Sequence, residues 1–290
     1  MKTNLKRTTY IEYIVLSIII LSIILLPNTF DWITRPKLNG PLQRSAMILA
    51  IFILSFVVLG VHELGHLITG LVQGFKFQLF VIGPLGIKRT KDKIVFFLNK
   101  NLQYYGGIAA TIPKSDQPEN AEKFAKVILA GPITSLLFAI LLYTTANFID
   151  TPLAALCIDG GNISLAVFFA TTIPSKTGMF FTDRKRYQRL TRPGKDQEAE
   201  IALLKILGSF SKDNSYKNID ENDIQTLVED RIQFYQFFGL YNLICYQFEN
   251  NGKVDEQVYE EYDKVSKEIS KSIVKSFNKE IENYRLKTMS

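Results

Sequence analysis

Four mostly apolar stretches in the first 175 residues constrain the fold of this chain more than any other feature. They cover about residues 13–30, 45–72, 127–149 and 154–174. An α-helix needs about 20 such residues to cross a lipid bilayer. We therefore expect a mainly α-helical, polytopic membrane protein with four transmembrane helices.

The first stretch has a second interpretation, because a basic start followed by an apolar run is also typical of a cleaved signal peptide. Lys2, Lys6 and Arg7 supply that basic start. The apolar run is long, however, and no small-x-small cleavage site follows it. We therefore expect residues 13–30 to be a retained helix.

Most of the charge follows residue 175, where the chain becomes soluble in character. Amphipathic helical periodicity extends over residues 196–211, 222–249 and 255–286. Residues 234–246 are apolar enough to raise the alternative of a fifth span. They are too few and have charged flanks, so we expect a buried core helix instead. We expect Asn250-Asn-Gly252 to break a helical hairpin.

These patterns divide the chain into three expected domains. Residues 1–43 form a transmembrane helix and an external loop, residues 44–190 a membrane-embedded core, and residues 191–290 a cytosolic helical domain.

Two short β-prone segments lie between the second and third apolar stretches. Residues 77–82 and 93–98 are separated by Gly, Pro and charged residues, which predicts a membrane-associated hairpin or small sheet. The simpler interpretation is an amphipathic sheet resting on the bilayer. In the alternative, one of the two strands pairs at its edge with an extended substrate. We expect a polar loop over residues 113–122.

The net charge of +6 is concentrated beside the apolar stretches, which is typical of a topology signal. Basic residues are most numerous before the first stretch, between the second and third, and after the fourth. Arg35, Lys37 and Arg44 oppose this trend but are fewer. We expect a multi-pass protein of a bacterial plasma membrane with both termini in the cytosol.

The sequence does not favour binding of nucleic acid or a role for its cysteines. No basic stretch is interleaved with aromatic residues, so nucleic-acid binding is not expected. Cys157 and Cys245 lie far apart in very different segments, so we expect neither a disulfide nor a cysteine metal site.

The only two histidines of the chain lie four residues apart, in the segment H-E-L-G-H that starts at His62 and ends at His66. On a helix, residues i and i+4 share a face, so both imidazoles can reach one metal ion. Glu63 lies beside them, where a general base would be needed. The pattern predicts a Zn²⁺ site with Glu63 as the catalytic base, inside an apolar helix at membrane depth.

A catalytic zinc ion usually takes three protein ligands, and here the third has to be a carboxylate. The histidines lie about 27–33 Å down the second helix from its outer end. Asp150 and Asp159 are at the outer ends of their stretches, whereas Asp183 follows the fourth stretch on the cytosolic side. We therefore choose Asp183. The other cytosolic acids lie in an open polar loop without an apolar wall: Asp116, Glu119 and Glu122.

Asp183 has a plainer interpretation as a surface acid neutralised by the basic residues 184–186. The segment Gly131-Pro132 also allows two interpretations. It could loosen the third helix near the site, or it could simply start that helix, since proline is favoured in a first turn.

Residues 45–190 resemble the site-2 protease family, which consists of intramembrane zinc metalloproteases. The resemblance rests on H-E-L-G-H, on Gly131-Pro132 with Ser135 nearby, and on Pro174 followed by Asp183. It implies that His62, His66 and Asp183 bind zinc and that Glu63 is the catalytic base. It also implies maturation of small secreted peptides as a role.

The chain departs from the family pattern at several positions. Ser135 and Thr171 stand where the family tends to carry asparagine, so a substrate-binding role for either does not follow. The segment from Pro174 to Asp183 is longer than usual, and Arg184 replaces the glycine that usually follows the acid.

We expect a zinc-dependent intramembrane endopeptidase that cleaves transmembrane or membrane-bound peptide or protein substrates, in peptide maturation or in signalling. One alternative is a membrane protein that keeps zinc for structure or sensing without catalysis. Another is a transporter or export partner whose acidic and histidine side chains relay protons.

Overall fold

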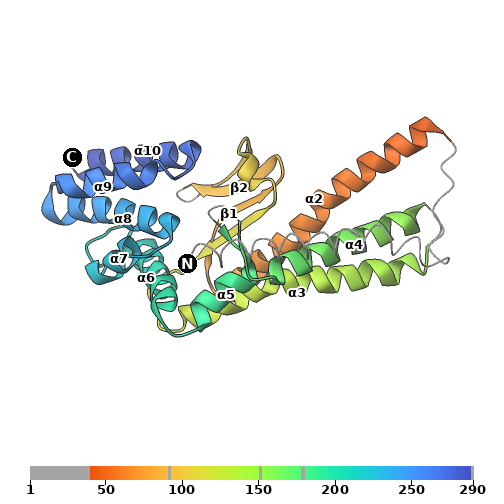
Figure 1. Ribbon diagram of the computed structural model, residues 1–290, viewed down its shortest axis with the longest axis horizontal. Coiled ribbons are helices and arrows are strands. Elements are labelled where there is room, and N and C mark those ends of the chain that lie inside the picture. Colours follow the sequence, from red (N-terminus) through yellow and green to blue (C-terminus); the bar gives the residue numbers. More distant parts are fainter. Residues whose placement is uncertain (1–39, 91–92, 150–151, 178–179, 289–290) are drawn as a thin grey trace, which may run out of the picture.

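The structure is a computed structural model that describes residues 40–90, 93–149, 152–177 and 180–288 (Figure 1). It is mainly helical, with a small antiparallel sheet. Among the described residues, three helices are long and apolar enough to cross a membrane: α2 (Pro41–Val72), α3 (Asn120–Ala146) and α4 (Leu153–Thr172). They correspond to the second, third and fourth apolar stretches. The expected first span, residues 13–30, lies outside the described residues.

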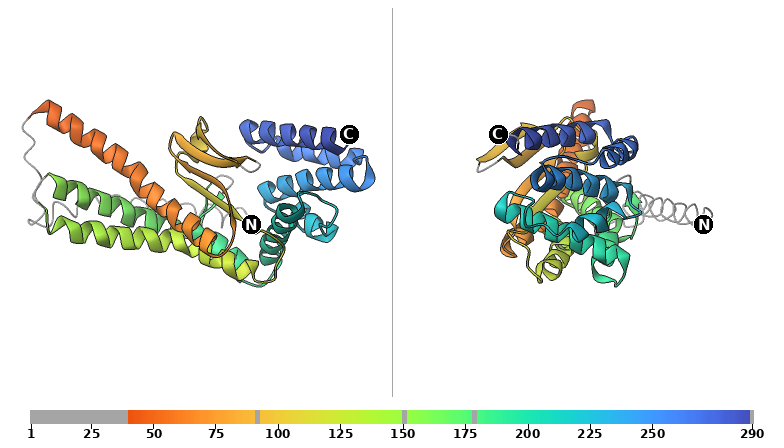
Figure 2. Two further views of the ribbon diagram at one scale, coloured as in Figure 1. Left: turned by 180° about the vertical axis from the view of Figure 1, so that it is seen from behind. Right: turned by 90° about the vertical axis from the view of Figure 1, so that its left-hand side faces the viewer.

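The three long helices lie at one end of the molecule, where α3 and α4 run side by side and α2 diverges from them toward its N-terminus (Figures 1 and 2). Near its other end α2 packs closely on α3. A Cβ added to Gly65 would come within 2.8 Å of the Ala130 carbonyl oxygen. The absence of a side chain at Gly65 thus lets α2 approach α3 closely. Large apolar side chains such as Phe52 and Leu137 remain exposed on the outer faces, as expected for helices surrounded by lipid.

Helix α3 begins at Asn120 and not near Val127, so Pro132 lies well inside it. The interpretation in which Gly131-Pro132 starts the helix is therefore wrong. The charged segment before the apolar stretch contains Ala, Glu and Lys, which favour helix, so the helix continues past the apolar residues. It also takes in the last residues of the expected polar loop.

A four-stranded antiparallel sheet follows α2, with strands β1 (Lys76–Ile82), β2 (Leu85–Thr90), β3 (Lys93–Leu98) and β4 (Ile108–Ile112). The spatial order is β3-β2-β1-β4. The sequence predicted β1 and β3 only. Because β1 lies between β2 and β4, the suggestion that residues 77–82 accept a substrate strand at their edge is wrong. Strands β3 and β4 form the two edges.

A short hairpin connects α4 to the next helix, α5 (Asp183–Thr191), which packs against α3. The strands of the hairpin are β5 (Lys176–Thr177) and β6 (Phe180–Phe181), and Thr182 closes its neck by donating a hydrogen bond to the Ile173 carbonyl. Helix α5 begins directly after it. The hairpin accounts for the long spacing between Pro174 and Asp183.

The remaining helices pack into a separate cluster at the other end of the molecule (Figures 1 and 2). They are α6 (Lys195–Asp213), α7 (Glu221–Val228), α8 (Gln233–Asn251), α9 (Glu256–Ser266) and α10 (Lys271–Thr288). Their buried core includes Phe237, Leu240 and Ile244 of α8. Residues 234–246 therefore lie in a buried core helix, as predicted.

Two of the three expected long helices in this region are in fact pairs. The helix expected over residues 222–249 is interrupted where the Asp230 carboxylate accepts a hydrogen bond from the Ile232 backbone N–H. The helix expected over residues 255–286 is interrupted between Ser266 and Lys271. The predicted break at residues 250–252 is confirmed, because Gly252 ends α8 with φ 71°.

Candidate metal centre

His62 and His66 lie on one face of α2, one turn apart, and point toward the same place. Their Nε2 atoms are 3.3 Å from each other. His62 is buried, and the His66 side chain is 12% exposed. The i, i+4 spacing thus brings the two imidazoles together as expected.

Asp183, the first residue of α5, joins this pair. Its Oδ2 atom is 3.2 Å from His62 Nε2, and its Oδ1 atom is 3.5 Å from His66 Nε2. The candidate ligand atoms of the three residues lie within 4.8 Å of one another. The three predicted ligands therefore meet at one point, and the interpretation of Asp183 as a surface acid does not fit this position.

Hydrogen bonds at the far side of each imidazole fix its orientation. His66 Nδ1 is 2.7 Å from the Val127 carbonyl oxygen, and His62 Nδ1 is 2.9 Å from Ser135 Oγ. A carbonyl oxygen can only accept, so His66 Nδ1 must carry a proton. In the neutral imidazole its Nε2 atom then presents a lone pair to His62 and Asp183.

This arrangement fits a bound cation. The lone pair of His66 faces a carboxylate, and Asp183 Oδ2 is buried without a hydrogen-bond partner. A buried acceptor without a partner is costly unless a cation or a proton lies between it and its neighbours. Two histidines and a carboxylate, with each imidazole held from behind, are the donor set of catalytic zinc sites.

Asp183 lies where positive charge favours its ionised form. Burial raises the pKa of the Asp183 carboxyl, whereas hydrogen bonds from the two imidazoles, when their Nε2 atoms carry protons, lower that pKa below its usual range. A cation held between the same atoms would favour the carboxylate in the same way. Asp183 also lies in the first turn of α5, where the helix dipole favours a negative charge.

Helix α3 makes room for the site at Gly131. A Cβ at this position would overlap Nε2 of His66. The next residue, Pro132, has no N–H, so the Ile128 carbonyl loses its usual helical partner. The Val127 carbonyl, which accepts from His66, is one residue earlier. The helix backbone is thus adapted to the imidazole at this depth.

Glu63 lines a cleft of about 420 Å³ together with His66 and Asp183. Its carboxylate interacts with the backbone N–H of Ala109 in β4. The other walls come from β4, from Phe124 and Ile128 of α3, and from Leu204 and Leu207 of α6. The Glu63 carboxylate therefore opens onto a space bounded by the edge strand β4.

Two residues at the family's asparagine positions have different surroundings. Ser135 contacts His62, and its carbonyl accepts a hydrogen bond from Ser164 Oγ. Thr171 donates to carbonyls of its own helix, at Val167 and Phe168. The sequence reasoning considered Ser135 only for substrate binding and missed its contact with His62, because the contact between α2 and α3 joins residues 73 positions apart.

The loop acids that were set aside lie on the surface. Glu119 pairs with Lys123, and Glu122 pairs with Lys126. Neither pair belongs to the metal cluster.

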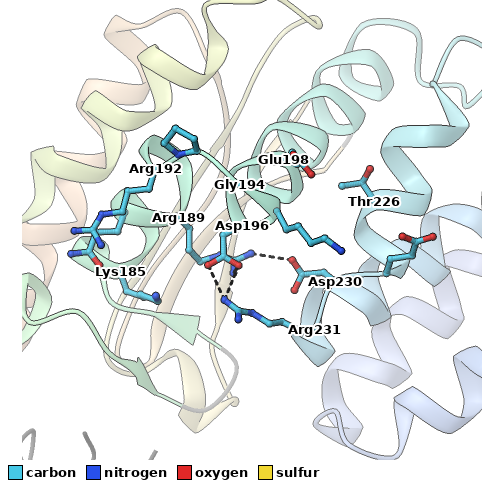
Figure 3. Close-up of a pocket in the computed structure, with 13 residues that line it drawn as sticks. Lys185, Arg189, Arg192, Gly194, Asp196, Glu198, Thr226, Asp230 and Arg231 are labelled. Carbon is cyan, nitrogen blue, oxygen red and sulfur yellow. Dashed lines mark hydrogen bonds and ion pairs between the residues drawn. The ribbon is translucent and has the colours of Figure 1, made fainter. Parts of the chain in front are cut away.

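A second cavity, of about 630 Å³, lies between α5, α6 and the α7–α8 connection (Figure 3). Charged side chains of both signs line it, including Lys185, Arg189, Asp196, Asp230 and Arg231. None of the residues of the metal cluster lines this cavity.

Comparison with known proteins gave one family match. The model of Peptidase family M50 matches residues 49–289, which include the metal cluster and helices α6 to α10. No curated protein and no solved structure matches the chain.

Proposed function

Because the chain belongs to peptidase family M50, the site-2 protease family, we propose that it is a zinc-dependent intramembrane endopeptidase. Members of this family are membrane metalloproteases that in general depend on zinc. The observation that carries the proposal is the convergence of His62, His66 and Asp183 beside Glu63 at the cleft.

In this proposal His62, His66 and Asp183, whose Nε2 atoms and carboxylate face one another, would hold the zinc ion. When bound, the ion supplies Lewis acidity, which polarises a peptide carbonyl and makes a water molecule more acidic. Glu63 accepts a proton from that water and passes it to the leaving amine. Ser135 and the Val127 carbonyl keep the two imidazoles aligned.

The proposed substrates are transmembrane or membrane-bound peptides or proteins. A helical peptide bond is shielded by its own backbone, so the scissile segment has to become extended. Strand β4 supports this, because within the described sheet it pairs only with β1 and residues 107–112 line the cleft beside Glu63. An extended segment can add to such an edge. Maturation of a small secreted peptide and signalling are the two roles that we propose for cleavage.

We further propose a multi-pass position in a bacterial plasma membrane with both termini in the cytosol. Three apolar helices support membrane insertion. The excess of Lys and Arg around the sheet and after α4 supports the orientation. A fluorescent protein fused to the C-terminus, of a type that matures only in the cytosol, should then be bright, and a dark fusion would reject this orientation.

The proposed activity is tested with Glu63→Gln, which keeps the shape of the side chain but removes the base. We expect the purified wild-type protein to cleave single-span model peptides in detergent. The variant should lose cleavage by at least about a hundredfold, the scale of a general base, and keep its zinc. Cleavage at the wild-type rate by the variant would reject the mechanism.

The same measurement distinguishes the endopeptidase from the alternative functions. A non-catalytic zinc protein or an export partner would show no zinc-dependent cleavage by the wild-type chain on any model peptide. Stoichiometric zinc without cleavage would favour that alternative over the endopeptidase.

A further inference from the structure

The helix that begins with Asp183 is attached to the C-terminal helices through a buried arginine. Arg189, six residues after Asp183 on α5, is 2% exposed. Its guanidinium pairs with Asp196 at 2.9 Å, Glu200 at 2.9 Å and Asp230 at 3.2 Å. Figure 3 shows Arg189 beside Asp196 and Asp230. Asp196 and Glu200 belong to α6, and Asp230 follows α7. One side chain of α5 thus binds three carboxylates of the C-terminal helices.

Glu200 gives this attachment a second connection. Its Oε1 atom accepts hydrogen bonds from Arg189 Nε and, at 2.5 Å, from the Tyr235 hydroxyl. Its Oε2 atom lies 3.6 Å from Nε of Arg186, which is also on α5. Glu200 is 1% exposed, so a single buried carboxylate of α6 engages two arginines of α5.

Aromatic rings complete the surroundings of the arginine. The guanidinium of Arg189 lies 4.9 Å from the ring centroid of Phe181 and 4.8 Å from that of Tyr235. Phe181 precedes Asp183 by two residues, in β6. The arginine therefore fixes both the hairpin before Asp183 and the helix after it.

From this geometry we infer that the C-terminal helical domain positions the third metal ligand, with Arg189 as the positioning residue. The inference rests on the proposed zinc site. It assigns a role to α6–α8 that the catalytic mechanism alone does not require. In this role the C-terminal domain holds α5, the short helix from which Asp183 projects.

The length of α5 explains why such support is needed. A helix of 9 residues is too short to be stable alone in water. The position of its first residue therefore depends on the contacts made by the rest of the helix. Metal ligands must be held close to their productive geometry, and loss of supporting contacts typically lowers metal affinity about 10- to 100-fold.

Arg189→Lys and Glu200→Gln in the full-length protein test this inference. The first keeps the charge but loses the planar fork that binds several carboxylates, and the second keeps the shape but loses the charge. We expect each to weaken zinc binding by about tenfold or more, measured by competition with a chelator. We also expect the absorption bands of the Co²⁺-loaded protein to shift, because Asp183 then coordinates differently.

Two control variants separate positioning from general stability. Arg231→Lys changes a side chain that also pairs with Asp196 but is 75% exposed and does not belong to α5. Val265→Ala creates a cavity in the hydrophobic core of the C-terminal helices, where α9 packs on α8. We expect both to keep wild-type zinc affinity, even if Val265→Ala lowers the thermal unfolding temperature as much as Arg189→Lys does.

Wild-type zinc affinity in both Arg189→Lys and Glu200→Gln would overturn the inference. Equal loss of affinity in Val265→Ala would overturn it as well, because the effect would then follow stability alone. Failure of the proposed function is visible separately: a wild-type protein without zinc rejects the metal site itself, before any variant is compared.

Discussion

At the scale of single residues, the candidate site combines a short sequence motif with contacts that only the fold creates. The spacing of His62 and His66 predicts their shared face, and the expected depth of a third, carboxylate ligand predicts Asp183. The sequence does not reveal how the imidazoles are held from behind. Those partners, Ser135 and the Val127 carbonyl, belong to another helix.

Ser135→Ala tests whether this support affects metal binding. The change removes the Oγ atom that lies 2.9 Å from His62 Nδ1. We expect zinc affinity to fall by about tenfold and kcat/KM with it, because the imidazole loses its fixed orientation. Chelator competition and a cleavage assay measure the two effects.

Thr171→Val is the matched control, since the Thr171 hydroxyl bonds only within its own helix in the described structure. This variant should keep wild-type zinc affinity. Unchanged affinity in Ser135→Ala would show that the hydrogen bond to His62 does not support the metal.

At the scale of elements, apolar length predicted α2 to α4 well, because lipid selects for it directly. Strands β2 and β4 escaped prediction for a physical reason. The segment Ile108–Ile112 contains two alanines, and β2 contains glycine and two basic residues, so their strand form comes from pairing with β1 and not from intrinsic propensity. The break after α7 is likewise set by a local contact, the hydrogen bond from the Ile232 N–H to the Asp230 carboxylate.

The hairpin formed by β2 and β3 exposes an apolar face. Ile94, Phe96 and Leu98 alternate along β3 and are 56%, 78% and 70% exposed. Leu85 of β2, opposite Leu98, is exposed as well. An apolar surface of this kind, next to Lys88 and Arg89, fits the interface between lipid tails and headgroups. We propose that this hairpin contacts the bilayer.

Phe96→Trp in a Trp32→Phe background tests this contact, since the chain has one native tryptophan. In lipid vesicles we expect a blue-shifted emission that is quenched by lipids brominated on their acyl chains. Gln247→Trp, on α8 in the cluster of C-terminal helices, is the control and should not be quenched. Emission of a fully hydrated tryptophan at position 96 would reject the membrane contact.

At the scale of the whole molecule, core and C-terminal helices are less separable than the charge pattern predicts. The domain boundary proposed at residue 190/191 falls at the end of α5, whose Arg189 is bound by α6. Leu204 and Leu207 of α6 line the cleft beside Glu63. Periodicity identified α6 as a helix, but it carries no information about which surface that helix meets.

The metal content of the purified protein tests the central claim most directly. We predict about one zinc ion per wild-type chain and a large loss in Asp183→Ala, whereas Asp116→Ala, which removes a loop acid outside the cluster, should keep it. Elemental analysis after removal of loosely bound metal gives the number. A wild-type chain without zinc, or full zinc in Asp183→Ala, would contradict the assignment of His62, His66 and Asp183 as the metal site.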